Sequence, residues 1–307
     1  EHPAYYTPSP LPDEYARDGG GGHEGAGLVW KVDKASRMKE GDHVTIAPMP
    51  QGCGQCLQCA RGEPRHCVNK LPRPRSSGTH TQYMLVPESR LLAIPDSISF
   101  DIAAMMDDCV GTPYRAINRL GLRAGESVLI TGAGPIGAAA AIIAKYRNAT
   151  VIVVDVNDYR LQQAKNSGAD HILNPESEDV LDAVREISGG VPVAIDCSGA
   201  ASAQALCLDA ARANGRVALL GIGHHGQSQL PIDHMEHLVF KELTVIGGWA
   251  GTIPEHFEMV DLIQHGMPVD RIITHRFGME AAPTAMTTFF GGEAVKVIIQ
   301  PFADEEP

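Results

Sequence analysis

The stretch from Val128 to Asp155 constrains the fold of this chain more than any other part of the sequence. It reads VLITGAGPIGAAAAIIAKYRNATVIVVD, in which an apolar run, a glycine-rich turn, an alanine-rich segment and a second apolar run lead to an acid. Short runs of β-branched residues favour strands, whereas alanine favours helices. The stretch therefore predicts a strand, a turn, a helix and a second strand, the repeating unit of a parallel sheet covered by helices.

The glycine-rich turn carries the pattern G-x-G-x-x-G, formed by Gly132, Gly134 and Gly137. Gly132 permits a tight turn, Gly134 lets the backbone approach a pyrophosphate, and Gly137 allows helix and strand to pack closely. Free N–H groups at the start of the helix can hold anionic phosphates. Because both flanking strands are present, we expect a dinucleotide site that uses Gly132, Gly134, Pro135, Ile136 and Gly137. The simpler alternative is an ordinary turn without a ligand.

Asp155 ends the second strand about twenty residues after the turn, where dinucleotide-binding folds place the acid that contacts the adenosine ribose. A carboxylate there accepts hydrogen bonds from both ribose hydroxyls and repels a 2′-phosphate. The sequence therefore predicts NAD in preference to NADP. Arg160 is either a second contact with this ribose or a surface cation, and the sequence leaves both possibilities open.

A second motif consists of Cys53, Cys56, Cys59 and Cys67, in the pattern C-x2-C-x2-C-x7-C. Four thiolates at this spacing can form a closed tetrahedral zinc site, which leaves no position for a substrate, so we expect a structural zinc without a part in catalysis. The surrounding lobe, residues 51–74, has almost no apolar residues and needs the metal to hold its shape. Two disulfides, a redox CxxC pair and an iron–sulfur cluster are the alternatives.

Composition narrows the class of protein. The chain has 307 residues, 44% of them hydrophobic, and a formal net charge of −12. This length suggests two domains with separate cores. Without a basic run, nucleic acid is not an expected partner. No apolar run approaches the length of a membrane span and no signal peptide is visible, so we expect a soluble protein of the cytoplasm.

Regular elements are predicted from hydrophobic patterning. Residues 1–21 read as an irregular loop, and helical spacing runs from Ile102 to Leu120. Predicted strands occupy residues 27–32, 43–47, 81–86, 128–131, 151–155, 193–197, 216–221 and 243–249. Predicted helices begin at Pro135, Arg160, Ser177, Ala201 and Ile253, the last ending at Gly266. The tail from Ile272 to Gln300 reads as strand, helix and strand that rejoin the first domain.

Four further motifs accompany the cysteines and the dinucleotide pattern. They are GHEGAG at residues 22–27, GDHV at 41–44, KELTVIG at 241–247 and THRF at 274–277. Together these motifs resemble the zinc-dependent medium-chain alcohol dehydrogenases. The resemblance implies an α/β fold with a GroES-like β-rich catalytic domain at 1–110, incomplete at its N-terminus, and a Rossmann domain at 111–252. It also implies that residues 253–307 return to the catalytic domain, and that the protein is a homodimer or homotetramer.

The resemblance further implies a catalytic zinc in the cleft between the domains. His23 matches the family's histidine ligand, Glu24 the neighbouring acid, and Asp108 the third ligand, with Cys109 as the alternative. The family's first ligand is a cysteine upstream of the histidine, and no cysteine precedes Cys53. We expect that cysteine a few residues before Glu1, and poor occupancy of the catalytic site without it.

The implied reaction is hydride transfer between a secondary or primary alcohol and NAD, with Gly221 and Ile222 near the nicotinamide. A small alcohol or polyol, or the matching ketone, is the expected substrate. Its pocket would use residues 1–21 and the residues near Met105, Met106 and Trp249, where the sequence shows no convergent charge. Two alternatives are a zinc-free quinone or enoyl reductase of the same superfamily and a non-catalytic dinucleotide-binding relative.

Overall fold

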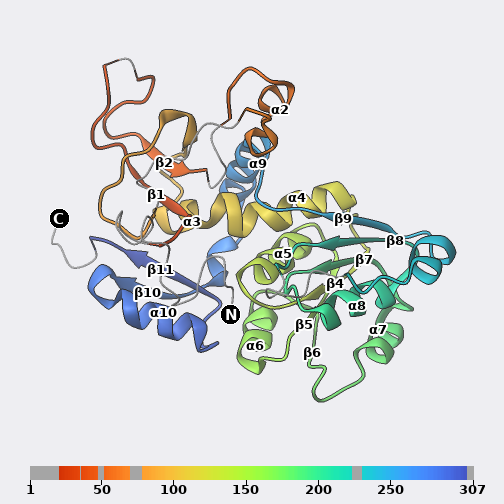
Figure 1. Ribbon diagram of the computed structural model, residues 1–307. Helices are drawn as coiled ribbons and strands as arrows, with labels where there is room; N and C mark the ends of the chain where they lie inside the picture. Colours follow the sequence, from red (N-terminus) through yellow and green to blue (C-terminus); the bar gives the residue numbers. More distant parts are fainter. Residues whose placement is uncertain (1–20, 35, 48–51, 70–77, 223–229, 303–307) are drawn as a thin grey trace.

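The computed structural model describes residues 21–34, 36–47, 52–69, 78–222 and 230–302. The expected loop at 1–20, part of the cysteine lobe and Gly223 lie outside these residues. Figure 1 shows a β-rich part in red and orange beside a larger part in green and cyan, with a long helical run between them.

The larger part is built on a six-stranded parallel sheet. Its strands are β4 (Ser127–Thr131), β5 (Thr150–Val154), β6 (His171–Leu173), β7 (Val191–Asp196), β8 (Ala211–Leu219) and β9 (Thr244–Gly247). Their spatial order is β6-β5-β4-β7-β8-β9, which is the doubly wound order of a Rossmann fold. The order reverses between β4 and β7, and folds of this kind bind dinucleotides at the carboxyl ends of the two strands where the order reverses. The predicted parallel sheet is confirmed.

Successive side chains along each strand point to opposite faces of the sheet, and each face packs against its own hydrophobic core. Val128 and Ile130 pack into one core, and Leu129, between them, packs into the other. The first face is covered by α4 (Gly111–Leu120), α5 (Pro135–Tyr146) and α6 (Asp158–Asn166), and the second by α7 (Val180–Ser188) and α8 (Ala201–Ala210). Because both faces are buried, the strands read as continuous apolar runs, which is why the sequence reveals them.

Several predicted boundaries shift by a few residues. The helix expected from Arg160 begins at Asp158, after an Asn157 side chain that caps it, and the one expected from Ser177 begins at Val180, after Asp179. Strand β6 was not predicted, because three residues carry too little pattern. The strand expected at 216–221 is β8, which begins earlier, and the one expected at 243–249 is the shorter β9.

The β-rich part contains an antiparallel sheet of β1 (Gly25–Leu28), β2 (His43–Ile46) and β3 (Leu91–Ala93). The strand predicted at 81–86 is wrong, because this segment has no hydrogen-bonded neighbour strand in the described structure. Its hydrophobic residues Tyr83 and Leu85 are exposed. An alternating apolar pattern predicts an extended chain, but a strand also requires a paired partner.

The predicted helix at 102–120 is interrupted by a π-helical turn. It consists of α3 (Phe100–Met105), capped by Ser99, the π-helical turn Met106–Val110, and α4, which ends at Gly121 in the left-handed conformation. Turns of this kind are rare in proteins, and those that occur are often found at functional sites. Here the turn carries Asp108, the predicted metal ligand.

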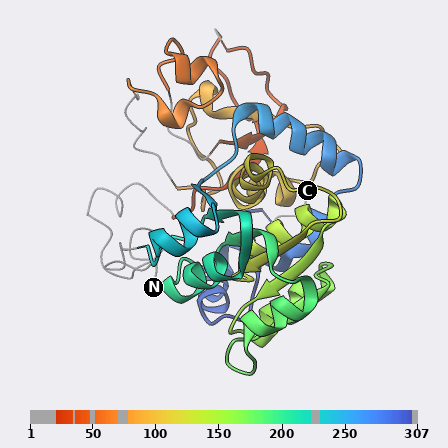
Figure 2. The ribbon, with the colours of Figure 1, turned by 90° about the vertical axis from the view of Figure 1, so that its right-hand side faces the viewer.

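The chain ends with α9 (Ile253–Gln264), β10 (Ile273–Gly278), α10 (Ala282–Phe290) and β11 (Lys296–Gln300). Helix α9 begins at a capping box formed by Thr252 and Glu255, and Figures 1 and 2 show it beside the cysteine lobe, where α2 (Leu57–Ala60) lies. Strands β10 and β11 pair in parallel. They approach the first domain through Arg276 and Gln300, whose side chains donate to the carboxylate of Asp101.

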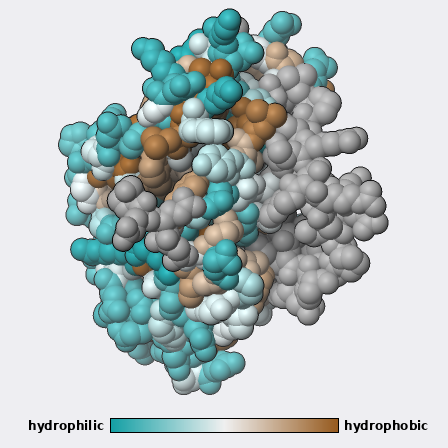
Figure 3. Space-filling model, turned by 90° about the vertical axis from the view of Figure 1, so that its left-hand side faces the viewer, coloured by the Kyte–Doolittle hydropathy of each residue, from teal (hydrophilic) through white to brown (hydrophobic). Residues whose placement is uncertain are grey.

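The surface of the described residues is mixed in character. Figure 3 shows hydrophobic side chains gathered in the upper part of one face, over the β-rich part. Large exposed hydrophobic residues of this part include Leu28, Trp30 and Leu85. None of the helices in the described ranges is long and apolar enough to cross a membrane.

Candidate active site

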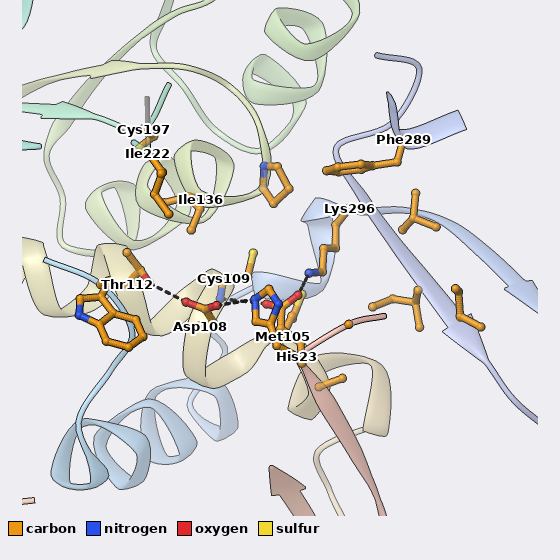
Figure 4. A pocket seen from close by; sticks show the side chains of 18 of the residues that line it. His23, Met105, Asp108, Cys109, Thr112, Ile136, Cys197, Ile222, Phe289 and Lys296 are labelled. Atoms are coloured by element: carbon orange, nitrogen blue, oxygen red, sulfur yellow. Dashed lines mark hydrogen bonds and ion pairs between the residues drawn. The ribbon is translucent and has the colours of Figure 1, made fainter. Parts of the chain in front are cut away.

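A cavity of about 460 Å³ opens between the β-rich part and the carboxyl end of the parallel sheet. One side is formed by the GHEGAG motif, the π-helical turn and the Lys296 end of β11, and the opposite side by the glycine turn and by the loops after β7 and β8. Figure 4 shows His23, Asp108 and Lys296 on one side of the cavity and Ile136 and Ile222 on the other. Its volume suits a small ligand together with one end of a cofactor.

His23 and Asp108 meet in this cavity. The Nε2 atom of His23 lies 2.7 Å from Oδ2 of Asp108, and the hydroxyl of Thr112 donates to Oδ1 of Asp108 at 3.0 Å. The Asp108 hydrogen bond raises the pKa of His23. Burial alone would raise the pKa of Asp108, but the hydrogen bond and charge of His23 and the Thr112 hydroxyl hold it below its usual value. The pair is therefore a carboxylate and an imidazole that share one contact.

Glu24 lies on the same side of the cavity and is held in place from two directions. Its Oε1 atom accepts a hydrogen bond from the backbone N–H of Cys109 at 3.1 Å, and its Oε2 atom forms an ion pair with Lys296. The cavity also contains the imidazole of His80, whose pKa is lowered by burial and by the nearby charge of His23. Convergent charge is thus present, contrary to the expectation from the sequence.

Cys109, the alternative to Asp108, sits in a different environment. Its thiol is buried, and this burial raises its pKa to about 12. It is the Asp108 side chain, and not that of Cys109, that contacts His23.

The glycine turn has the geometry expected from its sequence. Gly132 adopts a positive φ of 86°, which side chains disfavour. A Cβ atom on Gly137 would lie 1.7 Å from the carbonyl oxygen of Gly132, so this position excludes any side chain. A Cβ atom on Gly134 would meet no atom of the described residues within 4 Å. Pro135 and Ile136 line the cavity at the start of α5.

The acid at the end of β5 is oriented by the backbone. Oδ2 of Asp155 accepts from the N–H of Ala133 at 2.6 Å, and Oδ1 accepts from the N–H of Asn157 at 2.8 Å. Each oxygen keeps a lone pair for a further donor. Arg160 lies one turn into α6, and its buried Nε atom has no hydrogen-bond partner in the described part of the chain. Arg160 is only partly buried, so a ribose contact and a surface cation both stay open.

On the nicotinamide side of the predicted site, Gly221 and Ile222 both line the cavity. A Cβ atom on Gly221 would lie 1.9 Å from the backbone nitrogen of Gly199, so the loops after β7 and β8 touch there through their backbones. Met105 and Trp249 also line the cavity as expected. Met106 is not among the described residues that line the cavity, although it is buried in the same core as its neighbour Met105.

The four cysteines of the lobe lie together. Their sulfur atoms are all within 4.8 Å of one another, with 3.6 Å between Cys56 and Cys59 and 3.7 Å between Cys56 and Cys67. Zinc bonded to four sulfurs at about 2.3 Å separates them by about 3.8 Å, so the quartet fits this ion. The backbone N–H of Cys59 lowers the pKa of Cys56 to about 6, whereas burial raises the pKa of Cys59 itself to about 11. The fit to zinc therefore rests on the sulfur geometry. None of the four is in a disulfide.

Among the described residues, the quartet is also the single cluster of three or more potential metal ligands. His23 and Asp108 therefore form a pair without a third close ligand in that part of the chain. The sequence analysis did not identify Thr112, Lys296 and His80, which line the cavity. Thr112 follows Asp108 by four residues on one helical face, a spacing that was available as a signal.

Comparisons with known proteins agree with this architecture. Residues 135–265 match the family model described as zinc-binding dehydrogenase, and residues 10–96 match the alcohol dehydrogenase GroES-like domain. L-threonine 3-dehydrogenase of Marinomonas sp. (strain MWYL1) is 35% identical over 91% of this chain and 81% of its own length. The corresponding enzyme of Paraburkholderia phymatum is 33% identical over the same shares.

Solved structures show the same fold. Alcohol dehydrogenase TADH from Thermus sp. ATN1 is 27% identical with a TM-score of 0.81, covering 92% of this chain and 85% of that one. A protein from Sinorhizobium meliloti 1021, described as a zinc-binding dehydrogenase and bound to NADP, is 28% identical with a TM-score of 0.80 and covers 91% and 82%. The chain therefore belongs to the zinc-dependent medium-chain alcohol dehydrogenase family, with a GroES-like domain beside a Rossmann domain.

Proposed function

We propose that this protein is an NAD-dependent zinc alcohol dehydrogenase that transfers a hydride between a secondary or primary alcohol and the nicotinamide. The observation that carries the proposal is the composition of one cavity. It holds the His23–Asp108 pair on one side and Gly221 and Ile222, at the carboxyl end of the sheet, on the other. A substrate oxygen at the pair and a nicotinamide at the sheet would face each other across it.

The glycine turn supports the cofactor part of the proposal. Gly134 leaves room for a pyrophosphate beside the first N–H groups of α5, and Gly132 and Gly137 set the turn. Asp155 favours NAD, because its oxygens have free lone pairs for ribose hydroxyls and its charge repels a 2′-phosphate. Arg160 would add a contact at the same ribose. The NADP bound by the Sinorhizobium meliloti protein makes the choice of cofactor worth measuring first.

The imidazole of His23 and the carboxylate of Asp108 are ligands that zinc accepts, and Glu24 lies next to them. When bound, zinc lowers the pKa of an alcohol and so favours the alkoxide that gives up hydride. Thr112 fixes the direction of the Asp108 carboxylate, and Lys296 and the Cys109 N–H hold Glu24 aside as a reserve ligand. The remaining ligand would come from outside the described residues. The cysteine quartet would hold a second, structural zinc.

The polar groups of the cavity support a small, polar alcohol as substrate. His80 and the ammonium of Lys296 lie near the predicted reaction centre and can hydrogen-bond groups other than the reacting hydroxyl. The threonine dehydrogenases among the relatives suggest hydroxy amino acids beside polyols as compounds to test. We further propose a homodimer or homotetramer in the cytoplasm, on the basis of family membership alone.

The test is oxidation of a panel of alcohols by the zinc-loaded protein, followed by NADH or NADPH absorbance. The panel contains L-threonine, sorbitol, 2-butanol and ethanol, each with NAD and with NADP. We expect NAD-linked activity with at least one secondary alcohol, and its loss on His23→Gln. Reduction of quinones or enones that survives His23→Gln would instead identify a zinc-independent reductase. No turnover of any compound, with normal NAD binding, would favour the non-catalytic relative. That alternative is worth naming because the described residues supply two close ligands at this point.

A further inference from the structure

A three-residue stretch of backbone, Trp249–Gly251, lies between the cysteine lobe and the helical run that carries Asp108. We call it the crossover segment, because it leads from β9 to α9. We propose that Arg65 of the cysteine lobe is a positioning residue that orients Asp108 through the crossover segment and Thr112. The effect on turnover rests on the proposed function, whereas the effect on the crossover segment can be measured without it.

The lobe side of this connection is a buried cation. Arg65 is only 2% exposed, and its Nη1 atom donates to the carbonyl oxygens of Trp249, Ala250 and Gly251 at 2.6, 2.7 and 3.3 Å. An arginine guanidinium stays protonated at neutral pH, so Arg65 is a cation in this buried position. Charge-assisted hydrogen bonds of this kind are about twice as strong as neutral ones. Arg65 lies two residues before Cys67, so the quartet fixes where its side chain begins.

The opposite edge of the crossover segment points at the helical run. The N–H of Ala250 donates to Oγ1 of Thr112 at 2.8 Å, and the N–H of Gly251 donates to the carbonyl oxygen of Asp107 at 2.9 Å. Because the Thr112 oxygen already accepts from Ala250, its proton is directed toward Oδ1 of Asp108, 3.0 Å away. The other oxygen of Asp108 contacts His23.

The crossover segment has little freedom to move independently. Ala250 is fully buried and adopts a φ of 51°, a left-handed conformation that costs about 1 kcal/mol for a residue with a Cβ atom. Its surroundings must therefore hold it there. Gly111 packs against Gly251 so closely that a Cβ atom on Gly111 would lie 2.9 Å from the Gly251 nitrogen. A shift of the carbonyls away from Arg65 thus also displaces the N–H groups from Thr112 and Asp107.

This geometry changes what is expected of the lobe. The sequence predicts a zinc that stabilises the fold without a part in catalysis, whereas the hydrogen-bonded chain links the lobe to the proposed metal ligand Asp108. The hydrogen-bonded chain also includes a fluorescent reporter, Trp249. This side chain lines the cavity, and the protein contains only two tryptophans, Trp249 and Trp30. A Trp30→Phe protein therefore emits from Trp249 alone.

The test compares variants in the Trp30→Phe protein. Arg65→Met removes the donor to the crossover segment but keeps an apolar stem. Arg65→Lys restores a cation and is the rescue variant. Arg115→Met is the matched control: Arg115 binds Glu63 of the lobe and Glu255 of α9 but not the crossover carbonyls. Thr112→Val breaks the chain on the far side with the lobe intact, and Thr112→Ser preserves the hydroxyl.

We expect Arg65→Met and Thr112→Val each to shift Trp249 emission and to lower kcat about 10- to 100-fold with KM for NAD little changed. Arg65→Lys and Thr112→Ser should restore most of the parent's Trp249 emission and kcat. Arg115→Met should lower thermal stability without the emission shift. The double variant Arg65→Met/Thr112→Val should be no slower than the worse single variant, because both break one chain. Removal of the lobe's zinc by a chelator should shift Trp249 emission in the parent as Arg65→Met does.

The proposal is overturned if Arg65→Met and the Arg115→Met control have the same emission spectrum and kcat, or if the effects of Arg65→Met and Thr112→Val multiply. If Arg65→Met does not fold, Thr112→Val and chelation decide the question: unchanged Trp249 emission in both refutes it. If the parent oxidises no alcohol, the proposed function fails, and the emission arm still tests the connection by itself.

Discussion

The Nε2 atom of His23 lies 2.7 Å from the Oδ2 atom of Asp108, across the boundary between the GroES-like domain and the helical run that leads into the Rossmann domain. Each residue comes from a separate motif, and their contact places a carboxylate and an imidazole at one point of the cavity. On the basis of this contact we propose Asp108, and not its neighbour Cys109, as a metal ligand.

Replacing Asp108 by alanine is therefore expected to abolish alcohol oxidation while leaving NAD binding nearly unchanged, because Asp108 lies away from the glycine turn. Steady-state kinetics and fluorescence titration with NAD measure the two effects. Cys109→Ala is the matched control, and we expect it to retain most of the activity because the hydrogen bond to His23 is made by Asp108 and not by Cys109. Loss of activity in Cys109→Ala with activity kept in Asp108→Ala would assign the ligand to Cys109.

Substitution by alanine should have different effects at two glycines of the same turn, lowering folding stability at one and NAD affinity at the other. In Gly137→Ala the new Cβ atom would lie 1.7 Å from the Gly132 oxygen, so backbone must move, at a cost of about 1–3 kcal/mol or more in folding free energy. In Gly134→Ala it meets no protein atom within 4 Å, so stability should hold while NAD affinity falls. Thermal melts and NAD titration of both variants separate the roles. Equal melting losses would contradict this assignment.

Asp155→Ser should weaken NAD binding and reduce the preference over NADP, because a neutral side chain no longer repels a 2′-phosphate. The variant also loses an acceptor for the N–H of Asn157, so its melting temperature is measured alongside. Arg160→Ala serves as the comparison, since loss of NADP binding alone in that variant would show that Arg160 serves a phosphate. Tighter NADP than NAD binding by the unaltered protein would refute the preference.

Cys56→Ser should remove one of four zinc ligands and lower the zinc content by about one ion per chain, together with the melting temperature, because structural zinc sites contribute folding free energy. Metal analysis by mass spectrometry and a thermal melt measure the two quantities. Cys207→Ser is a control, since Cys207 is a buried thiol outside the lobe and its replacement should leave zinc content unchanged. Unchanged zinc and unchanged melting in Cys56→Ser would rule out the site.

The ion pair between Glu63 and Arg115 predicts that the stability of the fold depends on pH. Burial alone would raise the pKa of Glu63, but the hydrogen bond and charge of Arg115 hold it below its ordinary value of 4.5. A carboxyl whose pKa is depressed by folding stabilises the fold above its unfolded pKa, and the effect disappears as pH falls through the folded value.

Arg115→Met should therefore be less stable than the parent at pH 7 by about 1 kcal/mol, with the difference shrinking below about pH 4.5. Because both proteins carry the same cysteines, metal loss at low pH cancels in the comparison. Differential scanning fluorimetry between pH 7 and pH 4 measures it, and a difference that grows on acidification would have the wrong sign.

The parallel sheet could be predicted from the sequence because its strands are buried on both faces. Such strands read as unbroken apolar runs, and the turn between β4 and α5 requires glycines at fixed spacing. Patterning failed where an element depends on a distant partner. Residues 81–86 alternate like a strand but find no neighbour in the described structure, and β6 has only three residues.

By itself, the sequence determined the features that depend on local spacing: the dinucleotide turn, the acid at the end of β5, the cysteine quartet and, through its motifs, the family. The tertiary structure decided which side chains meet. Lys296 reaches Glu24, Thr112 reaches Ala250, and Arg65 reaches the crossover segment only because the two domains and the C-terminal segment pack together. Contacts between residues far apart in the chain follow from packing, and no local pattern encodes them.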